Sequence, residues 1–221
     1  GSFARGELYN SDPVSGDARL CWTTASLCGI EKAAYEKDEA ALERAVKLDL
    51  MLHAYMFTQS GIPVLYSGDE IGQENDYTYH EDPKKREDSR YLHRGRFPWE
   101  LAELRKKKGS VQEKLFSAIG EMERIRKRFS VFDSGADVRT IDTGNNAVLG
   151  LVRQTETEKL VALFNFSENP ATACVQENDG IYRDLITGSE MSAGDVEMPG
   201  YGAYWLLRKE SDAADGNGTV K

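Results

Sequence analysis

The chain has 221 residues, a formal net charge of −9 at pH 7, 29% charged residues and 40% hydrophobic residues. This composition is typical of a soluble globular protein with one large domain or two small ones. Because Lys and Arg are not in excess, little positive charge is available to neutralise phosphates, and no nucleic-acid partner is expected. No apolar segment is long enough to span a membrane, so no membrane partner is expected, and residues 1–5 do not form a signal peptide.

The cysteines Cys21, Cys28 and Cys174 form an odd, sparse set without a CxxC pair or a histidine at metal-ligand spacing. This pattern favours buried free thiols over a disulfide framework or a zinc site. Free thiols fit a reducing compartment, which favours a cytoplasmic location. No glycine-rich phosphate loop is present, and we predict neither a metal nor a cofactor.

The amino-terminal third of the chain combines loop-like and helical patterns. The first twenty residues are rich in Gly, Ser, Asn, Asp and Pro and are predicted to be a loop. Residues Leu20–Ile30 turn small and apolar, which predicts a short buried helix ending near Gly29. From about Asp38 to Gln59, apolar residues recur at intervals of three and four and predict an amphipathic helix.

The stretch Gly61–Gly72 reads Gly-Ile-Pro-Val-Leu-Tyr-Ser-Gly-Asp-Glu-Ile-Gly. Its apolar run Val64–Tyr66, bounded by Gly and Pro, predicts a short strand buried on both faces, as in a parallel sheet. Asp69 and Glu70 follow at the carboxyl end of this strand, where barrels and open α/β sheets keep their active sites. Adjacent residues of an extended segment point in opposite directions, so we expect one acid to face the site and one a structural partner. Both are predicted to support the site.

A long segment, from about Gly72 to Trp99, lacks a regular pattern, and loops of this length are usually functional or disordered. We predict that Arg90 in this loop and Arg19 near the amino terminus contact substrate, because a guanidinium can hold a hydroxyl or a carboxylate in a fixed fork. A surface arginine is the alternative for each. Asp17 and Asp88 stand two residues before these arginines and either orient them or shape a turn.

The carboxyl-terminal half begins with a second amphipathic helix, predicted from about Ser110 to Arg128, after which the pattern becomes period two. Short strands separated by turn signals predict a small antiparallel sandwich over residues 133–209, followed by a flexible tail over 210–221. The predicted strands are Val138–Thr143, Ala147–Arg153, Lys159–Phe166, Ala171–Val175, Ile181–Leu185, Asp195–Met198 and Gly202–Leu207.

Several of these segments resemble one enzyme family. The stretch Gly61–Gly72 resembles the last barrel strand of the α-amylase superfamily of glycoside hydrolases. Residues 1–6, 16–19 and 88–94 look like their counterparts in amylosucrases, in the same order and at similar spacing. Residues 160–170 are similar to the β-sandwich domain that follows the barrel in that superfamily.

The resemblance implies an α+β fold: the terminal helices and last strand of a (β/α)₈ barrel over residues 1–132, followed by the all-β sandwich. It implies a parent enzyme that acts on α-glucosidic bonds with retention, through a glucosyl-enzyme intermediate. The catalytic carboxylates of the family lie on earlier strands, and its His-Asp-Asp pattern is absent here, so this chain is expected to hold no catalytic residue. By the same resemblance, Arg90 helps close the glucosyl pocket, Arg19 lines the acceptor side, and Glu70 is the acid of the last-strand motif. Gly95, where the family usually has Pro, is a departure.

The expected function is therefore that of a carboxyl-terminal part of an amylosucrase-like enzyme, inactive by itself. The parent would transfer glucosyl units from sucrose to an α-glucan, or hydrolyse α-glucosides. Its partners would be sucrose or α-glucan and the missing amino-terminal part of the barrel. The isolated chain would expose faces that normally pack on that part, and we expect it either to self-associate through them or to rearrange residues 1–100. The alternatives are a part of an α-amylase or α-glucosidase, and a carbohydrate-binding or structural module using the sandwich aromatics Tyr182, Tyr201, Tyr204 and Trp205.

Overall fold

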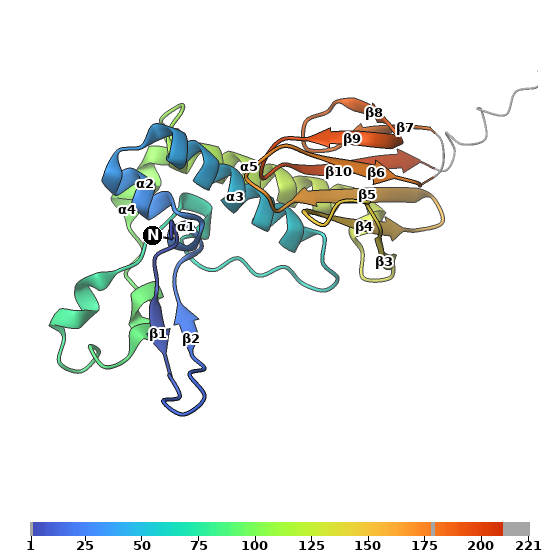
Figure 1. Cartoon of the computed structure of the whole chain (residues 1–221). Helices are drawn as coiled ribbons and strands as arrows, with labels where there is room; N and C mark the ends of the chain where they lie inside the picture. The colour runs from blue at the N-terminus through green and yellow to red at the C-terminus, as the bar shows by residue number, and fades with distance from the viewer. Residues whose placement is uncertain (1, 178–179, 210–221) are drawn as a thin grey trace, which may run out of the picture. The chain divides into compact units, whose positions relative to one another are not determined.

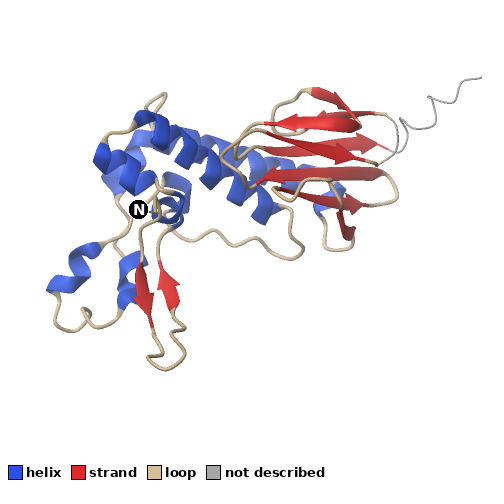
Figure 2. Cartoon of the chain, viewed as in Figure 1, coloured by secondary structure: helices blue, strands red, loops and turns tan. Residues whose placement is uncertain are grey.

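A computed structural model describes residues 2–177 and 180–209 and shows an α+β protein whose sheets are antiparallel (Figures 1 and 2). The chain divides into two compact units. The first comprises Gly1–Asp49 and Val64–Ala118, and in the second Leu50–Pro63 joins the described residues from Ile119 onward. The domain boundary predicted after residue 132 stays a prediction, and the predicted flexible tail lies outside the described residues.

The first unit opens with a hairpin rather than the predicted loop. Strands β1 (Glu7–Tyr9) and β2 (Arg19–Cys21) pair antiparallel, with Tyr9 opposite Arg19. The predicted helix over residues 20–30 is accordingly too long at its start: α1 spans Thr24–Cys28 and ends at Gly29, where φ is 95°. Glycine adopts this left-handed conformation without the usual steric cost. Helix α2 (Ile30–Glu36) follows immediately.

Short helical turns build much of the segment that was predicted to be irregular. It contains 3₁₀ helices at Tyr77–Glu81 and Ser89–His93, each begun by an aspartate side chain, Asp76 or Asp88, that accepts a hydrogen bond from the backbone. Helix α4 (Trp99–Glu103) and a further turn at Leu104–Lys106 follow. The sequence pattern missed these elements because a single turn is too short to show helical periodicity.

The predicted strand at Val64–Tyr66 does not form. Val64 is 76% exposed and Tyr66 is 50% exposed, and these residues belong to no strand. All strand pairs among the described residues are antiparallel, so this run has no parallel neighbour with which to pair. An apolar run alone does not make a strand, because its backbone groups need partners.

Both long predicted helices are confirmed. Helix α3 spans Glu39–Phe57, and the side chain of Asp38 accepts a hydrogen bond from the backbone N–H of Ala41 at its start. Helix α5 spans Val111–Arg128 and begins with Ser110, whose hydroxyl accepts from the backbone N–H three residues on. These side chains satisfy backbone donors that the first helical turn leaves unpaired.

The second unit contains the predicted strands, arranged as a six-stranded sheet in the order β3-β4-β5-β10-β7-β8 and a two-stranded sheet β6-β9. The seven predicted strands are confirmed, with ends that differ by at most two residues, and one short strand, β8, was missed. The strands are β3 (Asp137–Ile141), β4 (Val148–Gln154), β5 (Glu158–Asn165), β6 (Ala171–Val175), β7 (Ile181–Asp184), β8 (Glu190–Ser192), β9 (Gly194–Met198) and β10 (Ala203–Lys209).

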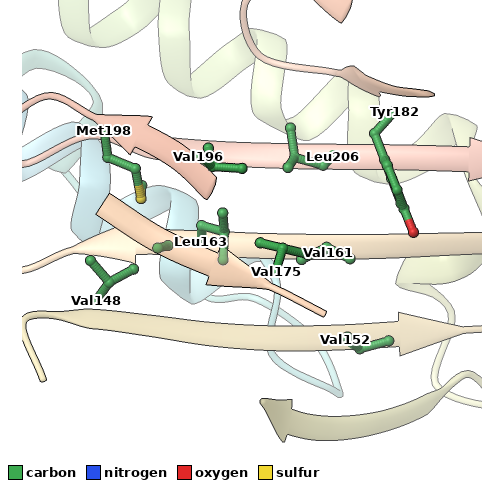
Figure 3. Close-up of a cluster of buried hydrophobic side chains, with 10 residues drawn as sticks. Val148, Val152, Val161, Leu163, Val175, Tyr182, Val196, Met198 and Leu206 are labelled. Atoms are coloured by element: carbon green, nitrogen blue, oxygen red, sulfur yellow. The ribbon is translucent and has the colours of Figure 1, made fainter. Parts of the chain in front are cut away.

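Apolar side chains from both sheets form one buried cluster (Figure 3). Val161 and Leu163 of the six-stranded sheet gather there with Val175 and Met198 of the smaller sheet. Intervening residues of β5 are also buried, because the opposite face of the large sheet is covered within the same unit. On that face the ring of Tyr55 meets Phe164 edge-on, with centroids 5.5 Å apart. The central strands therefore carry nearly continuous apolar runs.

Candidate functional site

The clearest polar arrangement of the first unit is built around Arg90. The carboxylate of Asp88 starts the 3₁₀ helix by accepting from the backbone N–H of Arg90 at 3.1 Å. It also accepts two hydrogen bonds from the guanidinium, at 2.8 Å from Nε and 2.7 Å from Nη2. These bonds from Arg90 lower the pKa of Asp88 to about 2. The arginine is thus held in one orientation by its own turn.

The same guanidinium lies over the ring of Tyr9, 4.8 Å from its centroid. Arg19 is the residue directly opposite Tyr9 in the hairpin, and such cross-strand partners project to the same face. The hydroxyl of Ser89 donates to the backbone carbonyl of Leu8 at 2.8 Å and joins the arginine-bearing turn to the hairpin. The guanidinium of Arg90 therefore lies over the ring of Tyr9, and Arg19 is the cross-strand partner of that tyrosine, although 71 positions separate the two arginines in the sequence (90 minus 19).

The two aspartates that precede these arginines differ in what they contact. Asp88 orients its arginine, whereas Asp17 lies in a turn, where its backbone carbonyl accepts from the N–H of Asp12 at 2.7 Å. No ion pair joins Asp17 to Arg19 in the described ranges. The sequence left open whether each aspartate shapes a turn or orients its arginine. Asp17 lies in a turn, and Asp88 orients Arg90.

Asp69 and Glu70 lie in a 3₁₀ helix, Asp69–Ile71, so the predicted extended geometry with opposed side chains is wrong. Asp69 accepts from the backbone N–H of Tyr66 at 3.2 Å, and Glu70 accepts from that of Gly68 at 2.9 Å. Both carboxylates bind the backbone of the preceding turn. Gly68 fits this turn because its φ is 101° and a Cβ there would overlap the side chain of Gln73.

A second arrangement, which the sequence did not reveal, centres on Glu7. Its carboxylate accepts a short hydrogen bond from the hydroxyl of Tyr79 and lies 2.9 Å from Nε2 of His80. The rings of Tyr79 and His80 stack with centroids 4.2 Å apart. Burial and the bond to Glu7 raise the pKa of Tyr79. Glu7 lies more than seventy residues from Tyr79 and His80 in the sequence, so no local pattern could predict this cluster.

A third polar network fixes the base of the hairpin. The side-chain oxygen of Asn75 accepts from the backbone N–H of Thr23 at 2.9 Å, and its amide donates to the carbonyl of Arg5 at 3.2 Å. Ser26 accepts from the backbone N–H of Asn75 at 2.9 Å and donates to Glu31 at 2.5 Å. Buried polar groups that are satisfied in this way specify one arrangement of the chain around them.

These contacts define what the surface beside Tyr9 can do. Arg90 already donates Nε and Nη2 to Asp88 and lies over the ring of Tyr9, so a ligand at this surface would meet the remaining N–H donors of Arg90, which suit hydroxyl or carboxylate oxygens. Within residues 2–177 and 180–209, no group of three or more His, Cys, Asp or Glu side chains is placed to hold a metal ion. Over the same residues, no helix is both long and apolar enough to cross a membrane.

Two of the four sandwich aromatics are buried in the core. Tyr182 and Trp205 are 1% and 0% exposed, and Trp205 packs on Phe132 with ring centroids 5.1 Å apart. Tyr201 and Tyr204 are half-buried. Tyr182 and Trp205 are therefore core residues, as their period-two placement indicates, and are not available to stack on a sugar.

Comparison with known proteins gives one partial family match and several similar structures. A family model described as beta-galactosidase C-terminal domain matches residues 151–203, which is less than half of the chain. The structure of AmyP in complex with maltotriose is 18% identical, with a TM-score of 0.60, and the match covers 74% of this chain and 35% of that one.

Trehalulose synthase from Pseudomonas mesoacidophila and isomaltulose synthase from a Klebsiella species have TM-scores of 0.54 and 0.57. Each is 18% identical, and the matches cover 73% of this chain and 38% of each enzyme. These neighbours are α-amylase family enzymes, and the likeness is one of fold. The chain spans little more than a third of their length.

Proposed function

We propose that this chain is the carboxyl-terminal part of a retaining α-glucan enzyme of the α-amylase superfamily, most similar to amylosucrase. The parent transfers glucosyl units from sucrose to an α-glucan or hydrolyses α-glucosides. The observation that carries the proposal is that Arg90, held by Asp88, lies over the ring of Tyr9, whose cross-strand partner is Arg19. In this proposal Arg90 helps close the glucosyl pocket and Arg19 lines the acceptor side.

The reaction itself needs carboxylates that lie elsewhere in the parent. A retaining glycosidase uses two carboxyl groups about 5 Å apart, one as nucleophile and one as acid and base. In this proposal they stand on earlier barrel strands, and residues 1–132 complete the barrel. Asp69 and Glu70, which hold the turn after Tyr66, support the rim of the site.

The exposed run Val64–Tyr66 supports the same proposal. The side chains of Val64 and Tyr66 are exposed and the backbone of the run belongs to no strand, as expected of a closing barrel strand apart from its neighbours. The missing amino-terminal part of the barrel is then the principal protein partner. The isolated chain covers these faces by self-association.

The test is made on the parent protein and on the 221-residue chain. The parent is expected to release fructose from sucrose, whereas the chain alone turns over neither sucrose nor maltoheptaose. Hydrolysis of maltoheptaose by the parent, without fructose release from sucrose, would instead indicate an α-amylase or α-glucosidase. Turnover by the purified 221-residue chain would overturn the proposal.

Substitution of Arg90 tests the proposed site directly. In the parent, Arg90→Ala removes charge-assisted hydrogen bonds to the glucosyl unit, and we expect kcat/KM to fall by roughly one hundredfold. The matched control is Arg86→Ala in the same loop, because Arg86 is exposed and, among the residues that the structure describes, its side chain pairs only with neighbouring Glu87. Equal kcat/KM values for the two variants would contradict the role of Arg90.

A further inference from the structure

The second unit contains a cleft of about 540 Å³ between the carboxyl-terminal half of α5 and the outer face of β7 and β10. Its apolar wall comes from Ile125 and Phe129 on the helix side and from Leu185 and Leu207 on the sheet side. Ile125 and Leu207 are 6% and 7% exposed. The wall is therefore fixed by packing on the core of the unit.

Three cationic side chains line the same cleft: Arg128, Arg183 and Lys209. Arg183 stands opposite Leu207 in the β7–β10 pair, and Lys209 lies two residues beyond Leu207, so both belong to the face that forms the cleft. Arg128 lies 5.3 Å from the ring centroid of Phe129. Helix and sheet thus bring three positive charges to one hollow.

These charges lack acidic partners in the part of the chain that the structure describes, since no ion pair involves any of the three cations. The acid in the cleft, Glu121, is bound to Arg124 by hydrogen bonds of 2.9 and 2.6 Å. Glu158, the cross-strand neighbour of Lys209, accepts instead from Ser130 at 2.8 Å. Glu190 stands opposite Arg183 in the β7–β8 pair, but no ion pair joins the two among the described residues. The cleft therefore gathers three positive charges without a bound carboxylate in a chain whose net charge is −9.

We propose that this cleft binds a small phosphate monoester, with the phosphoryl group between Arg128, Arg183 and Lys209 and an apolar or ring-shaped body against Phe129 and Leu207. A phosphate monoester carries close to two negative charges and three acceptor oxygens, which matches three cations better than a single carboxylate does. Arginine binds phosphate through two parallel N–H donors. This site is independent of the proposed function, because it lies in the other compact unit from Arg90.

The test is calorimetric titration of the full 221-residue chain with phenyl phosphate and with inorganic phosphate. Phenyl phosphate is expected to bind more tightly, because its ring also contacts the apolar wall, and its affinity is expected to fall as NaCl is raised. An affinity independent of salt, or heat from neither probe at millimolar concentration, would overturn the proposal.

Variants locate the binding. Arg128→Ala and Arg183→Ala each remove charge-assisted hydrogen bonds, and each is expected to weaken phenyl phosphate binding about tenfold or more. Lys127→Ala is the matched control, since Lys127 is the exposed neighbour of Arg128 on the same helix and does not line the cleft. Equal affinity in all three variants would refute the site. Arg183 is exposed and its truncation is not expected to affect folding, which thermal melting of each variant verifies.

Discussion

Arg153 is a buried charge whose replacement tests how the second unit is held together. The residue is 0% exposed on β4. Its guanidinium donates to the backbone carbonyls of Val131 at 2.5 Å, Thr58 at 2.9 Å and Asp133 at 2.8 Å. The side chain therefore joins the end of α3, the turn before the sandwich and the sheet, and among the described residues no ion pair with a carboxylate involves it.

The magnitude follows from which carbonyls lose their donor in Arg153→Met, a change that keeps an unbranched apolar stem. Thr58 and Val131 are fully buried, and an unsatisfied buried acceptor costs about 1–3 kcal/mol. Two such groups cost about 2–6 kcal/mol. Against this, the burial that lowers the pKa of Arg153 shows that desolvation penalises its charge, and methionine relieves that penalty. We expect a net loss of about 3 kcal/mol, or roughly 6–12 °C in Tm for a protein of this size.

The assay is urea unfolding followed by tryptophan fluorescence, because Trp205 is fully buried in the same unit. The control is Arg139→Met on β3, where an exposed arginine pairs with Glu177 and should contribute under about 1 kcal/mol. If Arg153→Met is as stable as the unsubstituted 221-residue chain, the desolvation of the charge cancels the gain from the hydrogen bonds, and our account of how Arg153 stabilises the unit is wrong.

Three further predictions concern other parts of the chain. The carboxyl of Asp88 should titrate with a pKa of about 2 in the folded chain, below its ordinary value of 3.8. Because folding lowers this pKa, the stabilisation by the bond to Arg90 is complete above pH 3.8 and is lost as the pH falls toward 2. A carboxyl NMR titration with a midpoint at pH 3.8 would contradict this. Gly200→Ala should destabilise the chain by about 2 kcal/mol in the same urea assay, because a Cβ at this position would overlap the carbonyl group of Glu168. Gly135→Ala is the control and should be near neutral, because a Cβ there would meet no atom within 4 Å. Val64→Asp should reduce self-association in light scattering, while Val14→Asp, at a hairpin position that is 93% exposed, should not; a chain that stays monomeric at every concentration would disprove the association itself.

The elements that the sequence predicted well are those whose periodicity extends over several turns or strands. Helices α3 and α5 carry long apolar stripes, and the sandwich strands alternate between Gly- and Asn-containing turns. Such patterns depend only on residues close together in the sequence, so they can be detected without knowing how the rest of the chain folds. Strand β8, with three residues, and the single turns of residues 77–93 have no period to detect.

The errors at Val64–Tyr66 and in the first twenty residues have a different cause. A strand needs hydrogen-bonding partners, which are distant residues that a local pattern does not contain. Val64–Tyr66 has the right composition and no partner, whereas Glu7–Tyr9 has an unremarkable composition and finds one in Arg19–Cys21. Composition therefore predicted a strand where none forms and a loop where a hairpin forms.

The candidate site shows the same division between local and distant information. The pairing of Asp88 with Arg90 is local, because a carboxylate that begins a helical turn is within reach of a side chain two residues on. The placement of Arg90 over Tyr9, the cross-strand partner of Arg19, depends on residues far apart in the sequence. It rests on the hairpin register and on the hydrogen bond between Ser89 and Leu8. A substitution that broke that bond would leave Arg90 fixed within its own turn, while the turn would stay joined to the hairpin by the packing of Leu92 on Cys21. The arginine fork is thus intrinsic to its loop, whereas the surface it would offer to a sugar exists only in the folded unit.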